Sequence, residues 1–274
     1  MARSRLVSCA VGGGLAALSC AGAQAQFPAP TPPAQAAGYT LTFFDDFTNL
    51  NLAPDGVTGQ HAWYRGLWWE TPPSPFGATL NAKALQLTWQ RGQSPADTSV
   101  TSCSQDGLRC RGFRYGYFEA RMKWDVATGA WPAFWLLPVE NNWGASEGGE
   151  LDVFEGQGDP ANAHTYYGSI HDWKLVGGVY KDIANTNGHN AAILPGVDFT
   201  QWHNYGVLWT PGAMTWYFDD APIIDAKPYA IFDRQYYYPI LAAQEGANWK
   251  YGDLTGVTAQ SLKLTVDWVK VWQK

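Results

Sequence analysis

Three carboxylates stand within six residues of one another in the run from Gly148 to Gly156. Successive side chains of a regular strand alternate between faces, so Glu150 and Asp152 share one face and Glu155 points to the other. One extra residue at Val153-Phe154, a β-bulge, would return Glu155 to the face of the other acids, and bulges are common beside active sites. Retaining hydrolysis of a glycosidic bond needs two carboxyl groups about 5–5.5 Å apart. The run therefore predicts a bulged strand that carries carboxylates for this chemistry.

A solvated strand face or a calcium site would also explain a cluster of acids. The aromatic surroundings favour glycosidic chemistry, because the apolar faces of sugar rings stack on indoles, and the chain has fifteen tryptophans. The alternative for these tryptophans is a place in the core. The candidates for substrate binding are Trp131 and Trp135, which alternate with core-type residues, and Trp173 and Trp249, which stand in polar surroundings, with Trp68 and Trp69 as weaker ones.

Two further polar residues have candidate roles. His171 ends the run after the acids, and only a short loop separates the two runs, so we expect them to pair as a hairpin and His171 to contact the acids or the substrate. His164 has the opposite parity, and a surface position is the alternative for either histidine. Asp267 is opposite in phase to the apolar residues of its run, so it either binds a structural cation or faces water.

The elements that must position these residues are short β-like runs, separated by Gly, Pro, Asn and Asp, with no helical period longer than a turn or two. Ten or so strands in one chain indicate two packed sheets. The sequence has no internal repeat and no change in amino-acid composition along residues 39–274, so we expect these residues to form a single domain. The clearest runs are residues 39–44, 84–89, 115–124, 131–137, 150–155, 166–171, 203–210, 214–219, 238–243 and 262–272.

The first residues have the pattern of an export signal. Arg3 and Arg5 precede an apolar run, and Ala23-Gln24-Ala25 offers small residues for cleavage, so residues 1–25 are predicted to be a signal peptide. The Pro/Ala-rich residues 26–38 predict an extended linker. Cys20 matches a lipoprotein cleavage site weakly, which makes lipid anchoring the less favoured alternative. We expect a secreted or periplasmic protein without a transmembrane segment.

Cleavage after Ala25 changes the net charge from −6 to −8, which opposes binding to nucleic acid. It also leaves Cys103 and Cys110 as the two remaining cysteines, and in an exported protein this pair predicts a local disulfide. A zinc site is unfavourable because two cysteines without neighbouring histidines supply too few ligands. We expect a monomer that requires no cofactor, with a structural calcium as an option.

The run from Glu150 to Glu155 resembles the bulged form of the glycoside hydrolase family 16 signature. The resemblance covers roughly residues 40–273, and it implies an all-β jelly-roll sandwich of two antiparallel sheets with a concave substrate cleft. It also implies that Glu150 is the nucleophile, Asp152 its assisting acid and Glu155 the general acid/base. In some members an aspartate at the place of Asp267 contributes to a calcium site. The other similar segments, in the order of the family, are residues 115–123, 129–138, 208–211, 216–219 and 266–271.

The resemblance implies retaining hydrolysis of β-linked polysaccharides, and we expect an endo-acting enzyme for β-1,3- or mixed β-1,3-1,4-glucan. Two departures concern the subsites: only the second of two common histidines is kept, at His171, and residues 241–249 differ from the segment of many β-1,3-glucanases. The alternatives are a galactan hydrolase of the agarase or carrageenase type, a transglycosylase, or a glycan-binding module without activity. Such modules usually lack one of the acids, and this chain has all three.

Overall fold

The computed structural model describes residues 30–69, 77–92, 98–141, 145–183, 190–247 and 250–274. Contacts divide the chain into residues 1–30 and one compact unit, Thr31–Lys274, and the predicted signal peptide therefore lies outside the described residues. Strands dominate the described part, which contains three short 3₁₀ helices and no α-helix: η1 (Ala34–Ala36), η3 (Val139–Asn141) and η4 (Ala230–Asp233). None of its helices has the length and apolar character needed to cross a membrane. The predicted all-β class is confirmed.

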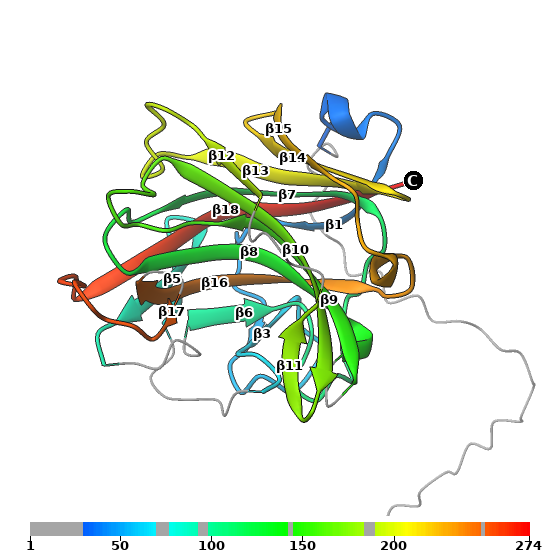
Figure 1. The fold of residues 1–274 in the computed structure, drawn as a ribbon, viewed down its shortest axis with the longest axis horizontal. Coiled ribbons are helices and arrows are strands. Elements are labelled where there is room, and N and C mark those ends of the chain that lie inside the picture. Colours follow the sequence, from blue (N-terminus) through cyan, green and yellow to red (C-terminus); the bar gives the residue numbers. More distant parts are fainter. Residues whose placement is uncertain (1–29, 70–76, 93–97, 142–144, 184–189, 248–249) are drawn as a thin grey trace, which may run out of the picture. The chain divides into compact units, whose positions relative to one another are not determined.

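The strands form two sheets, one behind the other (Figure 1). We call the sheet that contains the acidic run the inner sheet and the other the outer sheet. In order, the outer sheet is β15 (Ala221–Ala226), β14 (Ala213–Phe218), β13 (His203–Thr210), β7 (Gly116–Trp124), β18 (Ser261–Gln273), β5 (Ala84–Gln90) and β4 (Ala78–Asn81), with β1 (Thr40–Asp45) also paired to β18. The inner sheet is β11 (Val179–Asp182), β10 (Thr165–Val176), β9 (Glu147–Glu155), β8 (Ala130–Pro138), β16 (Tyr237–Ala247), β6 (Ser99–Thr101), β3 (Trp63–Arg65) and β2 (Leu52–Ala53), with β12 (Asn190–Ile193) on β10 and β17 (Lys250–Tyr251) on β16.

The main core lies between the two sheets and follows the predicted alternation. From the outer sheet, Phe118 and Met122 of β7 point into it and are fully buried. From the inner sheet, Phe134 and Leu136 of β8 do the same, so that Trp131, Ala133 and Trp135 take the opposite face. This alternation fixes which side chains of the inner sheet are available outside the core.

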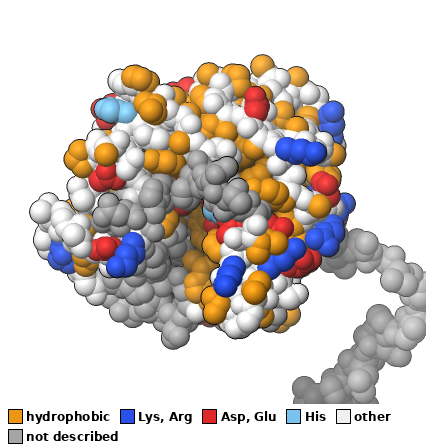
Figure 2. Space-filling view, in the orientation of Figure 1, with side chains coloured by type: hydrophobic (Ala, Val, Ile, Leu, Met, Phe, Trp, Pro, Cys, Tyr) orange, Lys and Arg blue, Asp and Glu red, His pale blue; other side chains and the backbone are white. Residues whose placement is uncertain are grey.

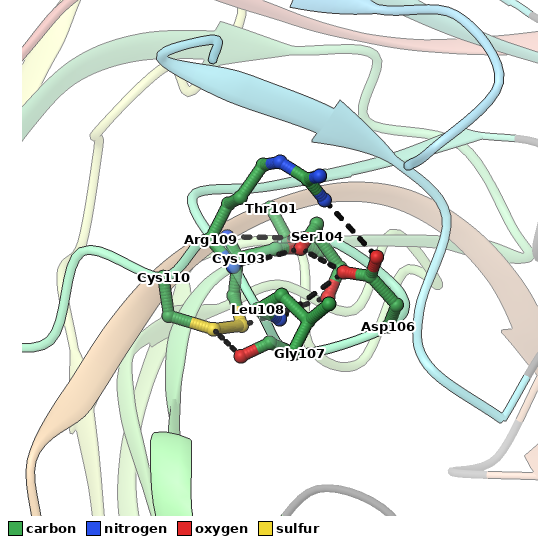
Figure 3. Close-up of a disulfide and its surroundings, with 8 residues drawn as sticks. All are labelled: Thr101, Cys103, Ser104, Asp106, Gly107, Leu108, Arg109 and Cys110. Atoms are coloured by element: carbon green, nitrogen blue, oxygen red, sulfur yellow. Dashed lines mark hydrogen bonds and ion pairs between the residues drawn. A yellow bond between two sulfur atoms is a disulfide. The ribbon is translucent and has the colours of Figure 1, made fainter. Parts of the chain in front are cut away.

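A second apolar cluster covers one part of that opposite face. Trp135 and Ile240 pack there against Leu67 and the disulfide between Cys103 and Cys110, which confirms the predicted pair. Within the disulfide loop the carboxylate of Asp106 accepts hydrogen bonds from neighbouring groups and pairs with Arg109 at 3.0 Å (Figure 3). The disulfide loop therefore packs against part of the inner sheet and is held by its own hydrogen bonds.

The predicted linker ends earlier than residue 38. Ala36 in η1 is fully buried against Tyr117 and Trp272 of the outer sheet. The amide of Gln35 donates hydrogen bonds to the hydroxyl of Tyr117 at 2.8 Å and to Asp220 at 2.9 Å. The residues from Thr31 onward therefore belong to the folded unit, because a small side chain and one amide anchor them.

Candidate active site

The acidic strand β9 contains the predicted bulge. Against β10, Tyr167 pairs with Glu155 and Ser169 with Asp152, so one residue of β10 lies opposite two of β9. Against β8 the register shifts at the same place, between Phe134 and Trp135. One residue of β9 is therefore extra on both sides, as in a β-bulge.

The bulge places the three acids on one face. Val153 and Phe154 are adjacent in sequence, yet both belong to the main core. The next residue, Glu155, therefore returns to the face of Asp152 and Glu150, which is turned away from the core. Asp152 is 2 % and Glu155 8 % exposed, and Glu150 is more exposed. In Figure 2 acidic and hydrophobic side chains lie together around a hollow near the middle of the face shown.

Two tryptophans hold the outer acids from the strands on either side of β9. The indole N–H of Trp131, on β8, donates a hydrogen bond to Oε1 of Glu155 at 2.9 Å. The indole N–H of Trp173, on β10, donates one to Oε2 of Glu150, also at 2.9 Å. A donor to a carboxylate makes a strong, charge-assisted hydrogen bond, so each glutamate has a fixed orientation.

The middle acid, Asp152, is held by a histidine and a fourth carboxylate. Nε2 of His171 lies 3.1 Å from Oδ2 of Asp152, and its Nδ1 lies 2.8 Å from Oδ2 of Asp182 on β11. The imidazole also stacks on the indole of Trp173 with 5.6 Å between ring centres. The predicted hairpin of β9 and β10 brings these groups together.

The site combines buried acids with one cation. Burial raises the pKa of Glu150, and the charge of Glu155 adds to this, while the charge of His171 and the N–H of Trp173 oppose it. Burial and the charges of Glu155 and Glu150 raise the pKa of Asp152 well above its usual range. Burial alone would lower the pKa of His171, but the hydrogen bonds and charges of its acidic neighbours raise it to about 11. The imidazole is therefore protonated at neutral pH.

Comparisons with known proteins agree with this geometry. The sequence profile of Glycosyl hydrolases family 16 matches residues 78–270, which include most strands of both sheets and all three acids. The chain belongs to this family.

A curated relative supports the assignment, and a solved structure supports the fold. The "Endo-1,3-1,4-beta-glycanase EglC" of Rhizobium meliloti is 31% identical over 275 residues, which are 85% of this chain and 51% of the relative. A "Beta-glucanase" of Rhodothermus marinus is 27% identical, over 58% of this chain and 57% of the relative. The laminarinase catalytic domain of Thermotoga petrophila superposes with a TM-score of 0.64 at 21% identity, over 86% of this chain and 98% of that domain. The chain thus spans about half the length of the curated relatives.

Three residues of the site could together hold a metal ion. Glu150, Asp152 and His171 each offer a ligand atom within 4.8 Å of the others. Both ring nitrogens of His171 face carboxylates, so His171, Asp152 and Asp182 form a hydrogen-bond network. Asp267 lies on the outer sheet, where its Oδ2 accepts a hydrogen bond from Arg121 at 2.6 Å, and a calcium ion there stays a prediction.

The predicted tryptophans differ in their positions. Trp131 and Trp173 are partly exposed beside the acids, as expected. Trp135 lies on the predicted face, opposite Asp152 in the register, but it is only 7 % exposed because the second apolar cluster surrounds it. Its prediction as an exposed cleft residue is therefore corrected. Trp69, one of the weaker candidates, is 51 % exposed, and its ring centre lies 6.5 Å from that of Trp135.

Three other positions complete the comparison with the sequence. Trp249 lies outside the described residues. His164 binds the carbonyl of Val197 through Nδ1 at 3.0 Å and takes no part in the network of the acids, which matches its parity. Asp182 was not predicted, although the Gly177-Gly178 pair before it is a hairpin signal that would have placed it beside β10.

Proposed function

We propose that this chain is a secreted, retaining endo-β-glucanase that hydrolyses β-1,3- or mixed β-1,3-1,4-glucan by double displacement. The observation that carries the proposal is the single face of β9 on which Glu150, Asp152 and Glu155 stand together. Membership of family 16 and the name of the Rhizobium meliloti relative support the substrate class.

In the first step the carboxylate of Glu150 attacks the anomeric carbon while Glu155 gives its proton to the glycosidic oxygen. The bond between that carbon and oxygen breaks, and the sugar is left as an ester of Glu150. In the second step Glu155 takes a proton from water, which attacks the same carbon and releases Glu150. Both glutamates return to their starting states, so the proton balance closes.

The surrounding donors fit these roles. The N–H of Trp173 stabilises the negative charge on Glu150 before attack and after release. The protonated His171 donates a hydrogen bond to Asp152, which in turn stands beside the nucleophile. The indole N–H of Trp131 keeps Glu155 in place while it changes between acid and base.

Export, a polysaccharide as partner and a monomeric state belong to the same proposal. The signal-like residues 1–25 and the disulfide support a place outside the cytoplasm. Anchoring through Cys20 is the less favoured form, because Ala17 occupies the usual leucine position. The protein acts there without a required cofactor.

The test is a panel of purified polysaccharides: a β-1,3-glucan, a mixed β-1,3-1,4-glucan, agarose and a carrageenan. We expect new reducing ends from the two glucans, a rapid fall in viscosity that marks endo action, and a first product with the β configuration. Glu150→Gln and Glu155→Gln should each lower kcat by at least a thousandfold, whereas Glu140→Gln, at an exposed position, should not. Release from the galactans alone would favour the galactan hydrolase instead, and binding without cleavage would favour a glycan-binding module.

A further inference from the structure

Two buried main-chain carbonyls at the bulge in β9 accept hydrogen bonds from side chains on other strands. The carbonyl of Asp152 accepts a hydrogen bond from the indole N–H of Trp216 at 2.8 Å. The carbonyl of Val153 accepts one from the hydroxyl of Tyr166. Since a bulge disrupts the regular ladder, and a buried carbonyl needs a donor, these side chains satisfy the strand where it is irregular.

Trp216 reaches the bulge across the core. It stands on β14 of the outer sheet, 64 residues from Asp152 in sequence, and it is fully buried. The strand beside β9, β10, leaves room for the indole, because a Cβ on Gly168 would lie 2.5 Å from its Cδ1 and Nε1. Gly168 is the residue of β10 directly beside the register shift. The indole of Trp216 on the outer sheet thus occupies the space that Gly168 leaves on the inner sheet, next to the bulge.

Tyr166 holds the next carbonyl from β10 itself. Its ring is fully buried and packs edge-on against Phe154, with 5.1 Å between centres, and stacks on Tyr205 at 5.9 Å. Burial raises the pKa of Tyr166 well above its usual value, so the hydroxyl keeps its proton and remains a donor. The contact with Phe154 fixes the second residue of the bulge as well.

We propose that Trp216 and Tyr166 are positioning residues, which hold the bulge and thereby keep Glu155 on the face of Glu150 and Asp152. Neither touches the substrate face, since both lie in the main core. The inference rests on the proposed function only in its consequence for catalysis. The geometry of the bulge can be tested without it.

Trp209 is a matched control for packing alone. It lies on β13, which is next to β14, and it is also fully buried. Its indole nitrogen has no hydrogen-bond partner among the described residues. Trp209→Phe therefore removes the same atoms as Trp216→Phe, without removing a hydrogen bond to β9.

The experiment compares W216F, Y166F and W209F in the full chain. The values of kcat and KM are measured with the glucan that the wild type cleaves, and the stability of each variant is measured by urea unfolding. We expect W216F to lower kcat at least tenfold with KM within twofold of the wild type, because Glu155 loses its position while the binding surface stays. W209F should keep kcat within twofold at a similar loss of stability. If W216F does not fold, Y166F, which lacks one oxygen atom, should lower kcat about threefold. Wild-type kcat in W216F, or an equal loss in W209F, would overturn the proposal.

A crystal structure of W216F, or of Y166F if W216F does not fold, supplies a readout that needs no substrate. We expect the register of β9 to change between Asp152 and Glu155 and the hydrogen bond from Trp131 to Glu155 to be lost. An unchanged bulge would overturn the positioning role, even if the wild type proves to be an active glucanase. A wild type without glucanase activity would instead overturn the proposed function, and the structure would still decide about the bulge.

Discussion

The imidazole of His171 donates to Oδ2 of Asp182, from a distance of 2.8 Å at Nδ1. Asp182 is the last residue of β11, and its Oδ1 also accepts the main-chain N–H of Asp172 at 3.2 Å. The hairpin of β10 and β11 therefore fixes the carboxylate of Asp182 independently of its contact with His171. This arrangement fixes the ring orientation and favours the protonated imidazole beside Asp152.

Asp182→Asn should lower the pKa of His171 from about 11 towards its ordinary value. The substitution removes a negative charge and one acceptor for the imidazolium, while the partner Asp152 stays. A pH titration of the ¹³C- or ¹⁵N-labelled imidazole by NMR measures the midpoint. Asp225→Asn, on the outer sheet, is the control and should leave it unchanged. A midpoint in the variant equal to that of the wild type would show that Asp152 and Glu150 alone hold the proton.

His171→Gln should move the acid limb of kcat/KM to higher pH. The positive charge of His171 lowers the pKa of Glu150, and that carboxyl must be ionised to attack, so loss of the charge means that ionisation needs a higher pH. We expect a shift on the order of one pH unit, since a neighbouring charge changes a pKa by about that much. A pH profile between 4 and 9 measures it, with His164→Gln as control. A shift towards lower pH would contradict this account of the site.

Trp69→Ala should raise KM for a long glucan about fivefold and leave kcat within twofold, as expected for the loss of one stacking contact. The exposed indole stands edge-on to Trp68, with 5.3 Å between ring centres, and rests against Trp135 near the acids. It is therefore a rigid platform for a sugar ring. Leu108→Ala, at an exposed residue of the disulfide loop, is the control. Equal KM values for Trp69→Ala and the wild type would place the glucan elsewhere.

Glu119→Gln should make the free energy of unfolding less dependent on pH between about 4.5 and 7. Glu119 is 4 % exposed under the N-terminal segment, and burial raises its pKa from 4.5 to about 7, while the hydroxyl of Tyr117 donates to it. The folded state thus keeps a proton that the unfolded state loses, so the free energy of unfolding falls as pH rises from 4.5 to 7, by up to about 3 kcal/mol.

Urea unfolding at pH 5 and pH 8 tests this stability difference. The wild type should lose more stability between the two values than Glu119→Gln does. Glu140→Gln, at an exposed carboxyl, should behave like the wild type. Parallel losses in Glu119→Gln and the wild type would mean that the buried carboxyl does not titrate on unfolding.

Much of the fold follows from periodicity in the sequence. All ten runs predicted as strands exist, because their alternation of apolar and polar residues matches two faces of a sheet. The bulge was predictable as well, since three acids of one function cannot share a face of a regular strand in the spacing of Glu150, Asp152 and Glu155. Short or exposed strands were missed. In β11 no residue is buried, so no alternation marks it.

Contacts between distant segments could not be predicted in the same way. Trp135 has the parity of a cleft residue, but Leu67 and the disulfide loop, which bury it, are far from it in sequence. The composition of residues 26–38 is that of a linker, and nothing in it marks Ala36 as a buried anchor. Trp216 and Tyr166 likewise have the sequence pattern of ordinary core residues, and nothing in that pattern indicates that they donate hydrogen bonds to the bulge.

At the level of the gene, the bulge makes β9 tolerant of one change in length. Loss of the codon for Val153 would leave Glu-Leu-Asp-Phe-Glu, in which plain alternation still keeps the three acids on one face. Loss of the codon for Leu151 would instead make Glu150 and Asp152 adjacent and send them to opposite faces. A lineage could therefore gain or lose one residue at the bulge without moving an acid to the other face of β9.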